Sequence, residues 1–246
     1  MKQGSLFLVG GKDGRNKRRD LIERFVALCG GASASVLVIT SASKTPERHR
    51  KEYNKSFLAS GVRDVAVFHA EERAAAEDPD LLRSLDRADG VYFTGGGQRR
   101  LVDAMGGTRF EERLRRRHGR GLHVGGTSAG ASAMSAVMIA EGKGHAVELS
   151  EGFGLLKEII VDQHLTERGR LSRLVAAVSL RPAMLGFGLD EGTAVRIDPS
   201  GRAEVFGKGA LTVVDGPRVS VLTEGWRYEL TTRTARPPGR VVRSPA

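Results

Sequence analysis

The sequence predicts an α/β fold of three layers, in which helices cover both faces of a mostly parallel, twisted sheet and antiparallel strands follow near the C-terminus. Two observations support this prediction. The first two-thirds of the chain alternates β-branched or apolar runs with stretches of helical period. After residue 185 the apolar segments become short and β-rich, and turn residues such as Asp198-Pro-Ser-Gly201 separate some of them.

The alternating region contains five strands and six helices in the order expected for parallel strands joined by helices. The predicted strands are Leu6–Val9, Ser35–Thr40, Val62–Phe68, Gly90–Phe93 and Leu122–Val124. The predicted helices are Lys17–Leu28, Pro46–Ser60, Pro79–Leu85, Leu101–Met105, Phe110–Arg117 and Ala129–Val137.

A further apolar strand is predicted at Glu158–Val161, and a helix begins near Arg168. The β-rich remainder is expected to form antiparallel edge strands or a small meander on the same core. Its segments are Gly186–Leu189, Ala194–Ile197, Ala203–Phe206, Leu211–Val214, Val219–Leu222 and Tyr228–Thr232. We therefore expect a single α/β domain over residues 1–232. A basic, partly flexible tail that contains proline and arginine is expected over residues 233–246.

Bulk composition narrows the class of protein. The 246 residues, 40% of them hydrophobic, suit a single domain with a sizeable core. No apolar run approaches the ~18–20 residues that span a bilayer, and the N-terminal apolar run is too short for a signal peptide. These features predict a cytoplasmic protein without a membrane partner. The single cysteine, Cys29, excludes an intramolecular disulfide and is expected to be a small buried apolar side chain.

The net charge of +10 raises the question of a nucleic-acid partner. The arginines do not form one stripe, and aromatic residues, at 5% of the chain, do not interleave with a basic run as a base-stacking surface requires. We therefore interpret the charge as solvated basic faces, which argues against nucleic acid as a partner.

In open parallel sheets, ligands bind outside the carboxyl ends of the strands. The sequence places four segments directly after predicted strands, and these are the first places to look for a site: Gly10–Gly14, Ser41–Lys44, Gly95–Gln98 and Gly125–Gly130.

The most informative of these segments contains Gly126-Thr-Ser-Ala-Gly130, a G-x-S-x-G pattern between an apolar strand and a run of small residues. A strand, a sharp turn and a helix are the context in which this pattern forms a nucleophile elbow. The turn is strained, so its neighbours must be small, and here they are glycine and alanine. The pattern predicts that Ser128 is a nucleophile. By itself it also fits a helix start capped by Thr127 or Ser128, or an anion site without chemistry.

An oxyanion at Ser128 needs hydrogen-bond donors. The N–H of Ala129, at the start of the predicted helix, is one expected donor. The second is expected from Gly96 or Gly97, because glycine lets the backbone approach a ligand closely. A nucleotide-phosphate loop is the alternative for these glycines, but the chain has no G-x-x-x-x-G-K-[ST] motif, and Gly10–Gly14 does not match G-x-G-x-x-G.

A serine nucleophile also needs a base, and the chain has six histidines. His164 is the strongest of them, because it follows an apolar strand and lies in the polar segment Asp162–Arg170. A carboxylate that orients this base is expected in Gly186–Gly192, after another strand. Asp190 and Glu191 are adjacent, so only one of them should face His164. The residues alone leave that choice open.

With these segments in view, the chain resembles cyanophycinase and its relatives, a family that also includes aspartyl dipeptidases. The Asp162–Leu171 segment is far more diagnostic than the elbow. The matching pieces are Leu8-Val-Gly-Gly11, Phe93-Thr-Gly-Gly-Gly-Gln98, Gly125-Gly-Thr-Ser-Ala-Gly-Ala-Ser132, Asp162-Gln-His-Leu-Thr-Glu-Arg-Gly-Arg-Leu171 and Gly188-Leu-Asp-Glu-Gly-Thr193.

The resemblance implies a flavodoxin-like fold related to class I glutamine amidotransferases, a Ser-His-Glu triad of Ser128, His164 and Glu191, and no metal or other cofactor. It implies a peptide or polypeptide substrate and, since relatives are commonly dimers, a homodimer. The implied substrate is cyanophycin, a poly-aspartate chain with arginine on each side-chain carboxyl, cleaved at β-aspartyl linkages with release of β-Asp-Arg dipeptides. The implied substrate-binding residues are Gln98, Asp162, Gln163, Arg168, Arg170 and Arg173.

The chemistry of these residues suits such a substrate. Arginine guanidinium groups can bind substrate carboxylates through paired hydrogen bonds, and Asp162 is expected to pair with the substrate's guanidinium. The same arginines would otherwise form the solvated face of a helix. Gly97 stands where better-known cyanophycinases tend to carry an acidic residue. A related peptidase for other isoaspartyl or aspartyl peptides, and a catalytically silent binding protein on the same fold, are the alternatives.

Overall fold

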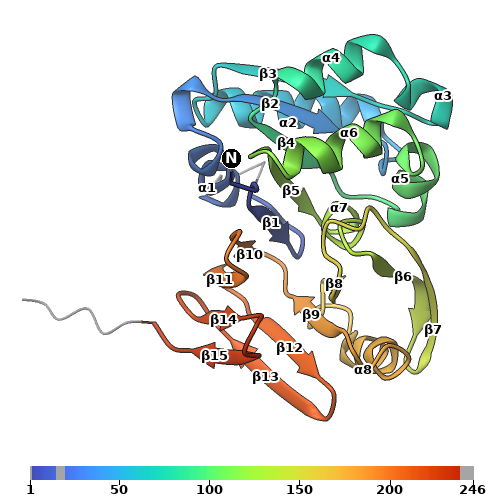
Figure 1. Ribbon diagram of the computed structural model, residues 1–246, viewed down its shortest axis with the longest axis vertical. Helices are drawn as coiled ribbons and strands as arrows, with labels where there is room; N and C mark the ends of the chain where they lie inside the picture. The colour runs from blue at the N-terminus through green and yellow to red at the C-terminus, as the bar shows by residue number, and fades with distance from the viewer. Residues whose placement is uncertain (1, 15–19, 239–246) are drawn as a thin grey trace, which may run out of the picture.

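A computed structural model describes residues 2–14 and 20–238 (Figure 1). Its largest element is a nine-stranded sheet with the order β15-β14-β11-β10-β1-β5-β4-β2-β3. The five strands from β1 to β3 in this order are parallel. They are β1 (Leu6–Val9), β5 (His123–Thr127), β4 (Gly90–Phe93), β2 (Ser35–Ile39) and β3 (Asp64–Phe68). The predicted α/β class and mostly parallel sheet are confirmed.

Helices cover both faces of the parallel strands, as predicted. One face carries α1 (Asp20–Leu28) and α2 (Pro46–Ala59), and the other carries α4 (Pro79–Arg87), α5 (Gln98–Met105) and α6 (Arg109–His118). Two short elements, α3 (Arg73–Ala76) and the 3-10 turn η1 (Gly31–Ser33), were not predicted from the sequence. The first residues predicted for α1 lie outside the described part of the chain.

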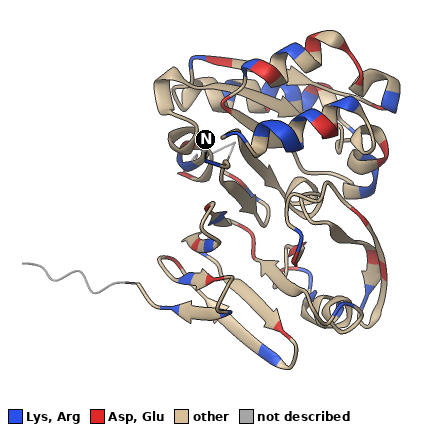
Figure 2. Ribbon diagram, in the orientation of Figure 1, with Lys and Arg blue, Asp and Glu red and all other residues tan. Residues whose placement is uncertain are grey.

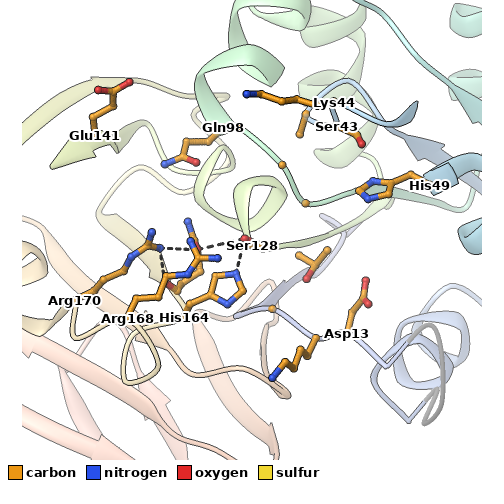
Figure 3. A pocket seen from close by; sticks show the side chains of 18 of the residues that line it. Asp13, Ser43, Lys44, His49, Gln98, Ser128, Glu141, His164, Arg168 and Arg170 are labelled. Carbon is orange, nitrogen blue, oxygen red and sulfur yellow. Dashed lines mark hydrogen bonds between the residues drawn. The ribbon is translucent and has the colours of Figure 1, made fainter. Parts of the chain in front are cut away.

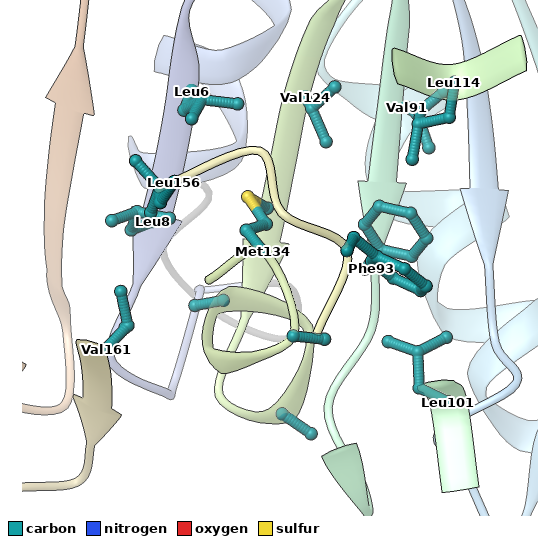
Figure 4. Packing of buried hydrophobic residues seen from close by; sticks show 14 of the residues in the cluster. Leu6, Leu8, Val91, Phe93, Leu101, Leu114, Val124, Met134, Leu156 and Val161 are labelled. Carbon is teal, nitrogen blue, oxygen red and sulfur yellow. The ribbon is translucent and has the colours of Figure 1, made fainter. Parts of the chain in front are cut away.

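The two faces of the sheet are separated by the alternation of side chains along each strand. In β1, Leu6 and Leu8 belong to the core under α4 to α6, whereas Phe7 and Val9 belong to the core under α1 and α2. Figure 4 shows Leu6 and Leu8 in the first of these cores, together with Val91 and Phe93 from β4 and Leu114 from α6.

The helices begin where their sequences favour a start. Pro46 and Pro79 occupy first-turn positions of α2 and α4, where a missing N–H costs no intrahelical hydrogen bond. Asp78 caps α4 by accepting a hydrogen bond from the backbone N–H of Asp80 at 2.6 Å. Thr108 caps α6 in the same way through the N–H of Glu111.

Four antiparallel strands extend the sheet beyond β1. They are β10 (Thr193–Ile197), β11 (Arg202–Gly207), β14 (Arg227–Glu229) and β15 (Thr234–Arg236). Strand β15 lies inside the segment assigned to the tail. The sheet therefore continues past residue 232, because Arg227–Glu229 pairs with Thr234–Arg236. Residues 239–246 lie outside the described part of the chain.

Part of the β-rich remainder forms a second sheet instead of extending the first one. It has four strands in the order β13-β12-β9-β8. Its members are β8 (Ile159–Gln163), β9 (Leu185–Leu189), β12 (Leu211–Asp215) and β13 (Arg218–Leu222). Strands β8 and β9 are parallel, and α8 (Leu171–Ser179) connects them and packs on Gly186 through Leu174 and Val178.

The helix predicted at Ala129–Val137 is wrong in length. Helix α7 covers Ala129–Ser132, and the chain then enters a hairpin of β6 (Val137–Lys143) and β7 (Ala146–Glu151). The carbonyls of Ala133 and Met134 accept hydrogen bonds from the N–H groups of Phe153 and Leu156, at 2.7 Å and 2.9 Å. These tertiary bonds occupy the acceptors that a longer helix would have used.

The burial of Cys29 and the hydropathy of the helices bear on two of the sequence predictions. Cys29 is buried at 8% exposure, and burial raises the pKa of its thiol, as expected of a small apolar core residue. Within residues 2–14 and 20–238, none of the helices has the length and hydropathy needed to cross a bilayer.

Figure 2 shows lysine and arginine spread over helices and outer strands of both sheets.

The packing around α7 generates a stability prediction. A Cβ at Gly130 would lie 2.3 Å from the carbonyl oxygen of Phe93, which is backbone and cannot move aside cheaply. We expect Gly130→Ala to lower the free energy of unfolding by about 1–3 kcal/mol, measured by urea denaturation. Gly119→Ala is the matched control, because Gly119 has helical φ of −61° and its Cβ would make only ordinary contacts. Equal stability of the two variants would contradict the prediction.

Candidate active site

The proposed nucleophile lies at the turn between β5 and α7. Ser128 has φ 53° and ψ −114°, a conformation that L-residues rarely adopt. The turn is held because the N–H of Ser128 donates to the carbonyl of Val9 in the neighbouring strand at 2.8 Å. The positions two residues before and two residues after Ser128 must be glycine, since a Cβ at Gly126 would lie 2.7 Å from the backbone of Gly130 and a Cβ at Gly130 would lie 2.3 Å from the carbonyl oxygen of Phe93. The strand, sharp turn and helix predicted around Ser128 are therefore present in the fold.

Three side chains from three strand ends form a continuous hydrogen-bonded chain. Ser128 Oγ lies 2.9 Å from His164 Nε2, and His164 Nδ1 lies 2.8 Å from Glu191 Oε1 (Figure 3 shows the first of these contacts). His164 follows β8 and Glu191 follows β9, so the second sheet brings an imidazole and a carboxylate to the serine of the first sheet. With Nδ1–H donated to the carboxylate, Nε2 is left as the acceptor for the serine hydroxyl.

The imidazole is held by the loop after β1. The N–H of His164 donates to the carbonyl of Gly10 at 2.9 Å, and His164 itself has φ 51°. Gly11 packs against the ring so closely that a Cβ there would lie 2.3 Å from Cε1 of His164. The first glycine pair of the chain thus sets the position of the base.

The structure distinguishes Asp190 from Glu191, the two adjacent acidic residues between which the sequence could not choose. The carboxylate of Asp190 accepts the backbone N–H groups of Thr166 and Ala210, both at 3.1 Å, and so joins two loops. Glu191 faces His164 instead. Adjacent side chains point in different directions, which gives Asp190 a structural role and Glu191 the contact with the base.

The electrostatics of the triad favour a neutral base beside an ionised carboxylate. Burial lowers the pKa of His164 below 6.5, and the nearby Arg168 and Arg170 lower it further, although the hydrogen bond to Glu191 acts in the opposite direction. Burial alone would raise the pKa of Glu191, but hydrogen bonds from Lys12 and His164 hold this pKa below its usual value of 4.5. At neutral pH the imidazole can therefore accept the serine proton.

The oxyanion donors expected from the sequence are only partly compatible with the geometry. The N–H of Gly97 already donates to the carbonyl of Ala42 at 2.9 Å, so this group is not free to receive an oxyanion. Gly96 lines the same cavity as Ser128 and has φ 147°, and a Cβ there would lie 2.0 Å from the carbonyl oxygen of Ala42. Gly96 and Ala129 remain as the candidate donors.

The expected substrate contact of Asp162 is contradicted by the fold. Asp162 is 1% exposed, and both of its carboxylate oxygens accept hydrogen bonds from Arg173, at 2.6 Å and 2.5 Å. Because Arg173 is itself only 6% exposed and also bonds to the carbonyl of Gly142, the two residues form an internal ion pair. Asp162 is therefore unavailable to a substrate guanidinium, and Arg173 is largely committed to the protein.

Other predicted binding residues do line the site. Arg170 donates to the backbone carbonyl and to the side-chain oxygen of Gln163, each at 2.8 Å, and that side-chain oxygen lies 3.3 Å from Ser128 Oγ. Burial and the neighbouring Arg173 lower the pKa of Arg170 to about 10, which leaves it charged at neutral pH. Arg168 is exposed at the cavity rim, and Gln98 donates to the carbonyl of Ile139 at 2.9 Å.

These groups surround a cavity of about 1150 Å³ at the carboxyl edge of the parallel strands. The loops after β1 and β2 form part of its wall, as the position of Gly10–Gly14 and Ser41–Lys44 predicted. Sequence reasoning missed Lys12 and Glu141 as individual cavity residues. Lys12 lies in the loop after the first predicted strand, whereas Glu141 lies on the β6–β7 hairpin, for which the sequence predicted no strand.

Comparisons with known proteins agree with this arrangement. Residues 6–204 match the family described as Peptidase family S51. The chain is 35% identical over 235 residues to a cyanophycinase from Geminocystis herdmanii, which covers 92% of this chain and 86% of that protein. It is 36% identical over 225 residues to a cyanophycinase from Synechococcus elongatus, with 89% of this chain and 70% of that protein covered.

A solved structure supports the fold independently. The crystal structure of a peptidase from an acI-B1 Actinobacterium has a TM-score of 0.78 and 22% sequence identity to this chain, and it covers 92% of this chain and 97% of that one. At this identity the likeness bears on the fold.

The lowered pKa of His164 predicts how reactivity depends on pH. A base must be neutral to accept the serine proton, so reactivity is full above the pKa of His164 and falls as the pH drops through it. We expect the rate at which a fluorophosphonate labels Ser128 to have its acid midpoint below pH 6.5. Labelling of His164→Ala should be slow at every pH. An acid midpoint above pH 7 in the wild-type chain would contradict the prediction.

Proposed function

The chain belongs to peptidase family S51 and is a serine peptidase of the cyanophycinase type, and we propose that Ser128, His164 and Glu191 are its catalytic triad. The observation that carries this proposal is the unbroken chain of hydrogen bonds from Ser128 Oγ through His164 to Glu191 at the wall of the cavity. A buried, oriented imidazole of lowered pKa beside a strained serine is the arrangement that acyl transfer requires.

The proposed reaction has two acyl-transfer steps. His164 accepts the hydroxyl proton as Ser128 Oγ attacks the substrate carbonyl, and the oxyanion is stabilised by the N–H groups of Ala129 and Gly96. His164 then gives this proton to the leaving amine as the carbon–nitrogen bond breaks. A water molecule, deprotonated by His164, attacks the acyl-enzyme ester, and the proton returns to Ser128 as the acid product leaves.

The expected products determine which bond is cut. If arginine leaves still attached to the side-chain carboxyl of aspartate, the β-linkage must stay intact. The bond that breaks is then the main-chain amide between two aspartyl units, and Ser128 attacks a main-chain carbonyl. This corrects the attack on a β-aspartyl linkage expected from the sequence, since hydrolysis of that linkage would release free arginine.

The cationic side of the cavity suits the carboxylates of such a substrate. In each unit the arginine retains a free carboxylate, and Arg168 and Arg170 line the cavity beside Ser128. Arg170 is held in place by its bonds to Gln163, so its guanidinium is preorganised for a planar anion. Gln98 is fixed by the β6 strand and presents its amide oxygen at the same wall.

The substrate guanidinium needs a carboxylate, and the Asp162–Arg173 pair removes the residue first expected to supply it. Among the described residues, Asp13 and Glu141 are the carboxylates that line the cavity. Asp13 is fully buried and accepts a hydrogen bond from Tyr53 at 2.5 Å, whereas Glu141 is exposed. In the view of Figure 3, Gln98 lies between Glu141 and Ser128. We therefore assign the guanidinium contact to Glu141.

The proposed reaction predicts a specific product. Wild-type protein incubated with cyanophycin should release a dipeptide of aspartate and arginine, identified by mass, while Ser128→Ala should release none and keep its folded circular-dichroism spectrum. Isoaspartyl dipeptides and ordinary α-peptides are tested in parallel. Hydrolysis of isoaspartyl peptides alone would identify a related peptidase of different substrate, and no hydrolysis with no labelling of Ser128 would identify a silent binding protein.

The assignment of Glu141 predicts a selective change in KM. Because an exposed ion pair contributes ~0.2–1 kcal/mol, we expect Glu141→Gln to raise KM about 1.4- to fivefold for arginine-bearing substrate. KM for an analogue with citrulline in place of arginine should not change. Glu151→Gln, an exposed residue of β7 in the same hairpin, is the matched control. An equal rise in KM for both substrates would reject the guanidinium contact.

A further inference from the structure

The second oxygen of the triad carboxylate is bound by a lysine. Glu191 Oε1 accepts the hydrogen bond from His164, and Glu191 Oε2 lies 2.5 Å from Lys12 Nζ. Among the described residues, His164 and Lys12 are the two side chains bonded to this carboxylate. We propose that Lys12 is a positioning residue of the triad, which orients Glu191 and tunes the basicity of His164. This inference builds on the proposed catalytic role of Ser128, His164 and Glu191.

The backbone delivers Lys12 to this place. Lys12 has φ 48°, in the left-handed region that few residues other than glycine adopt. The preceding Gly11 accepts the N–H of Gly192 at 2.8 Å, so the loop after β1 is tied to the residue that follows Glu191. The same Gly11 packs on the ring of His164. One loop therefore contacts the base on one side and the carboxylate on the other.

The charges around the site give Lys12 an electrostatic effect as well as a geometric one. His164 is faced by Glu191, Arg168 and Arg170, Glu191 by Lys12 and His164, and Lys12 by Glu191 and Glu167. The Lys12 ammonium helps to hold the pKa of Glu191 below its usual value, and Glu191 raises the pKa of Lys12. Without Lys12, the full charge of Glu191 would act on the imidazolium alone, and the pKa of His164 would rise.

The exposure of Lys12 separates this role from a structural one. Its side chain is 77% exposed, whereas that of Glu191 is 17% exposed, so the ion pair contributes little to folding. A lysine at the rim can still restrict the rotation of a carboxylate that would otherwise turn toward water, and small errors in the position of a triad residue reduce the rate strongly.

The test compares Lys12→Met and Lys12→Arg with the wild-type chain by two readouts, hydrolysis of cyanophycin and the rate of Ser128 labelling by a fluorophosphonate. For Lys12→Met we expect kcat and the plateau labelling rate to fall about three- to tenfold with KM nearly unchanged. Its acid midpoint should move to higher pH, because a base of raised pKa becomes neutral only there. Lys12→Arg should restore both the rate and the midpoint.

Lys55→Met is the matched control, since Lys55 is an exposed lysine of α2 outside the cavity and the substitution removes the same net charge. It should leave both readouts at wild-type values. Unchanged plateau rate and acid midpoint in Lys12→Met would overturn the inference, as would a rise in KM alone, which would make Lys12 a substrate contact. Equal losses in Lys12→Arg and Lys12→Met would also overturn it, by indicating a requirement of the loop itself.

The labelling readout keeps this test separate from the proposed function. Labelling of Ser128 requires the base and its carboxylate but no particular peptide. If wild-type protein is labelled yet hydrolyses no aspartyl substrate, the substrate assignment fails while the effect of Lys12 on the triad can still be measured. If neither reaction occurs in the wild-type chain, the catalytic role of Ser128 itself fails.

Discussion

The strained turn at Ser128 is the constraint on which the rest of the site depends. A residue with φ 53° and ψ −114° between a strand and a helix places its side chain at the sheet edge, but only if the chain can double back on itself. The glycines at 126 and 130 allow this, because a side chain at either would meet backbone atoms. The hydrogen bond from Ser128 N–H to Val9 anchors the turn to β1. The core under α4 to α6 holds the same strands in register, so the strain at the nucleophile is supported by the packing of the whole sheet (Figure 4).

The second sheet brings the other two residues of the proposed triad, His164 and Glu191, to this turn. Strands β8 and β9 are parallel neighbours and end just before His164 and Glu191, so one pairing places both residues at one edge. The buried Asp162–Arg173 pair joins β8 to α8 directly behind this edge. A buried ion pair adds little net stability when its desolvation is counted, but removal of one partner leaves an uncompensated charge. The Asp162–Arg173 pair therefore supports the segment that carries His164. Because the two charges bind each other, neither side chain is free to contact a substrate.

The charged side chains of the cavity are divided between its two sides. Arg168 and Arg170 lie near His164, Lys12 bonds to Glu191, and Glu141 lies on the β6–β7 hairpin at the other side of Gln98 in Figure 3. A substrate that carries one carboxylate and one guanidinium in each unit can contact both sides at once. Burial lowers the pKa of His164 and Arg168 and Arg170 lower it further, so the two arginines proposed to bind the anionic part of the substrate also help to keep the imidazole neutral.

The sequence by itself determined the class of fold and most strands and helices of the first two-thirds, and it singled out Ser128 and His164, whose side chains lie 2.9 Å apart in the fold. These follow from local signals: β-branched runs, proline at helix starts, and the obligatory small residues around Ser128. Residues alone could not choose Glu191 over Asp190, and a resemblance made that choice. Only the tertiary structure decided which strands pair in the second sheet and where the helix after Ser128 stops. It also decided three contacts: Asp162 binds Arg173, the N–H of Gly97 donates to Ala42, and Lys12 binds Glu191. Each of these depends on hydrogen bonds or ion pairs between segments far apart in the chain, and no local pattern of residue types encodes which distant group will satisfy a given donor or charge.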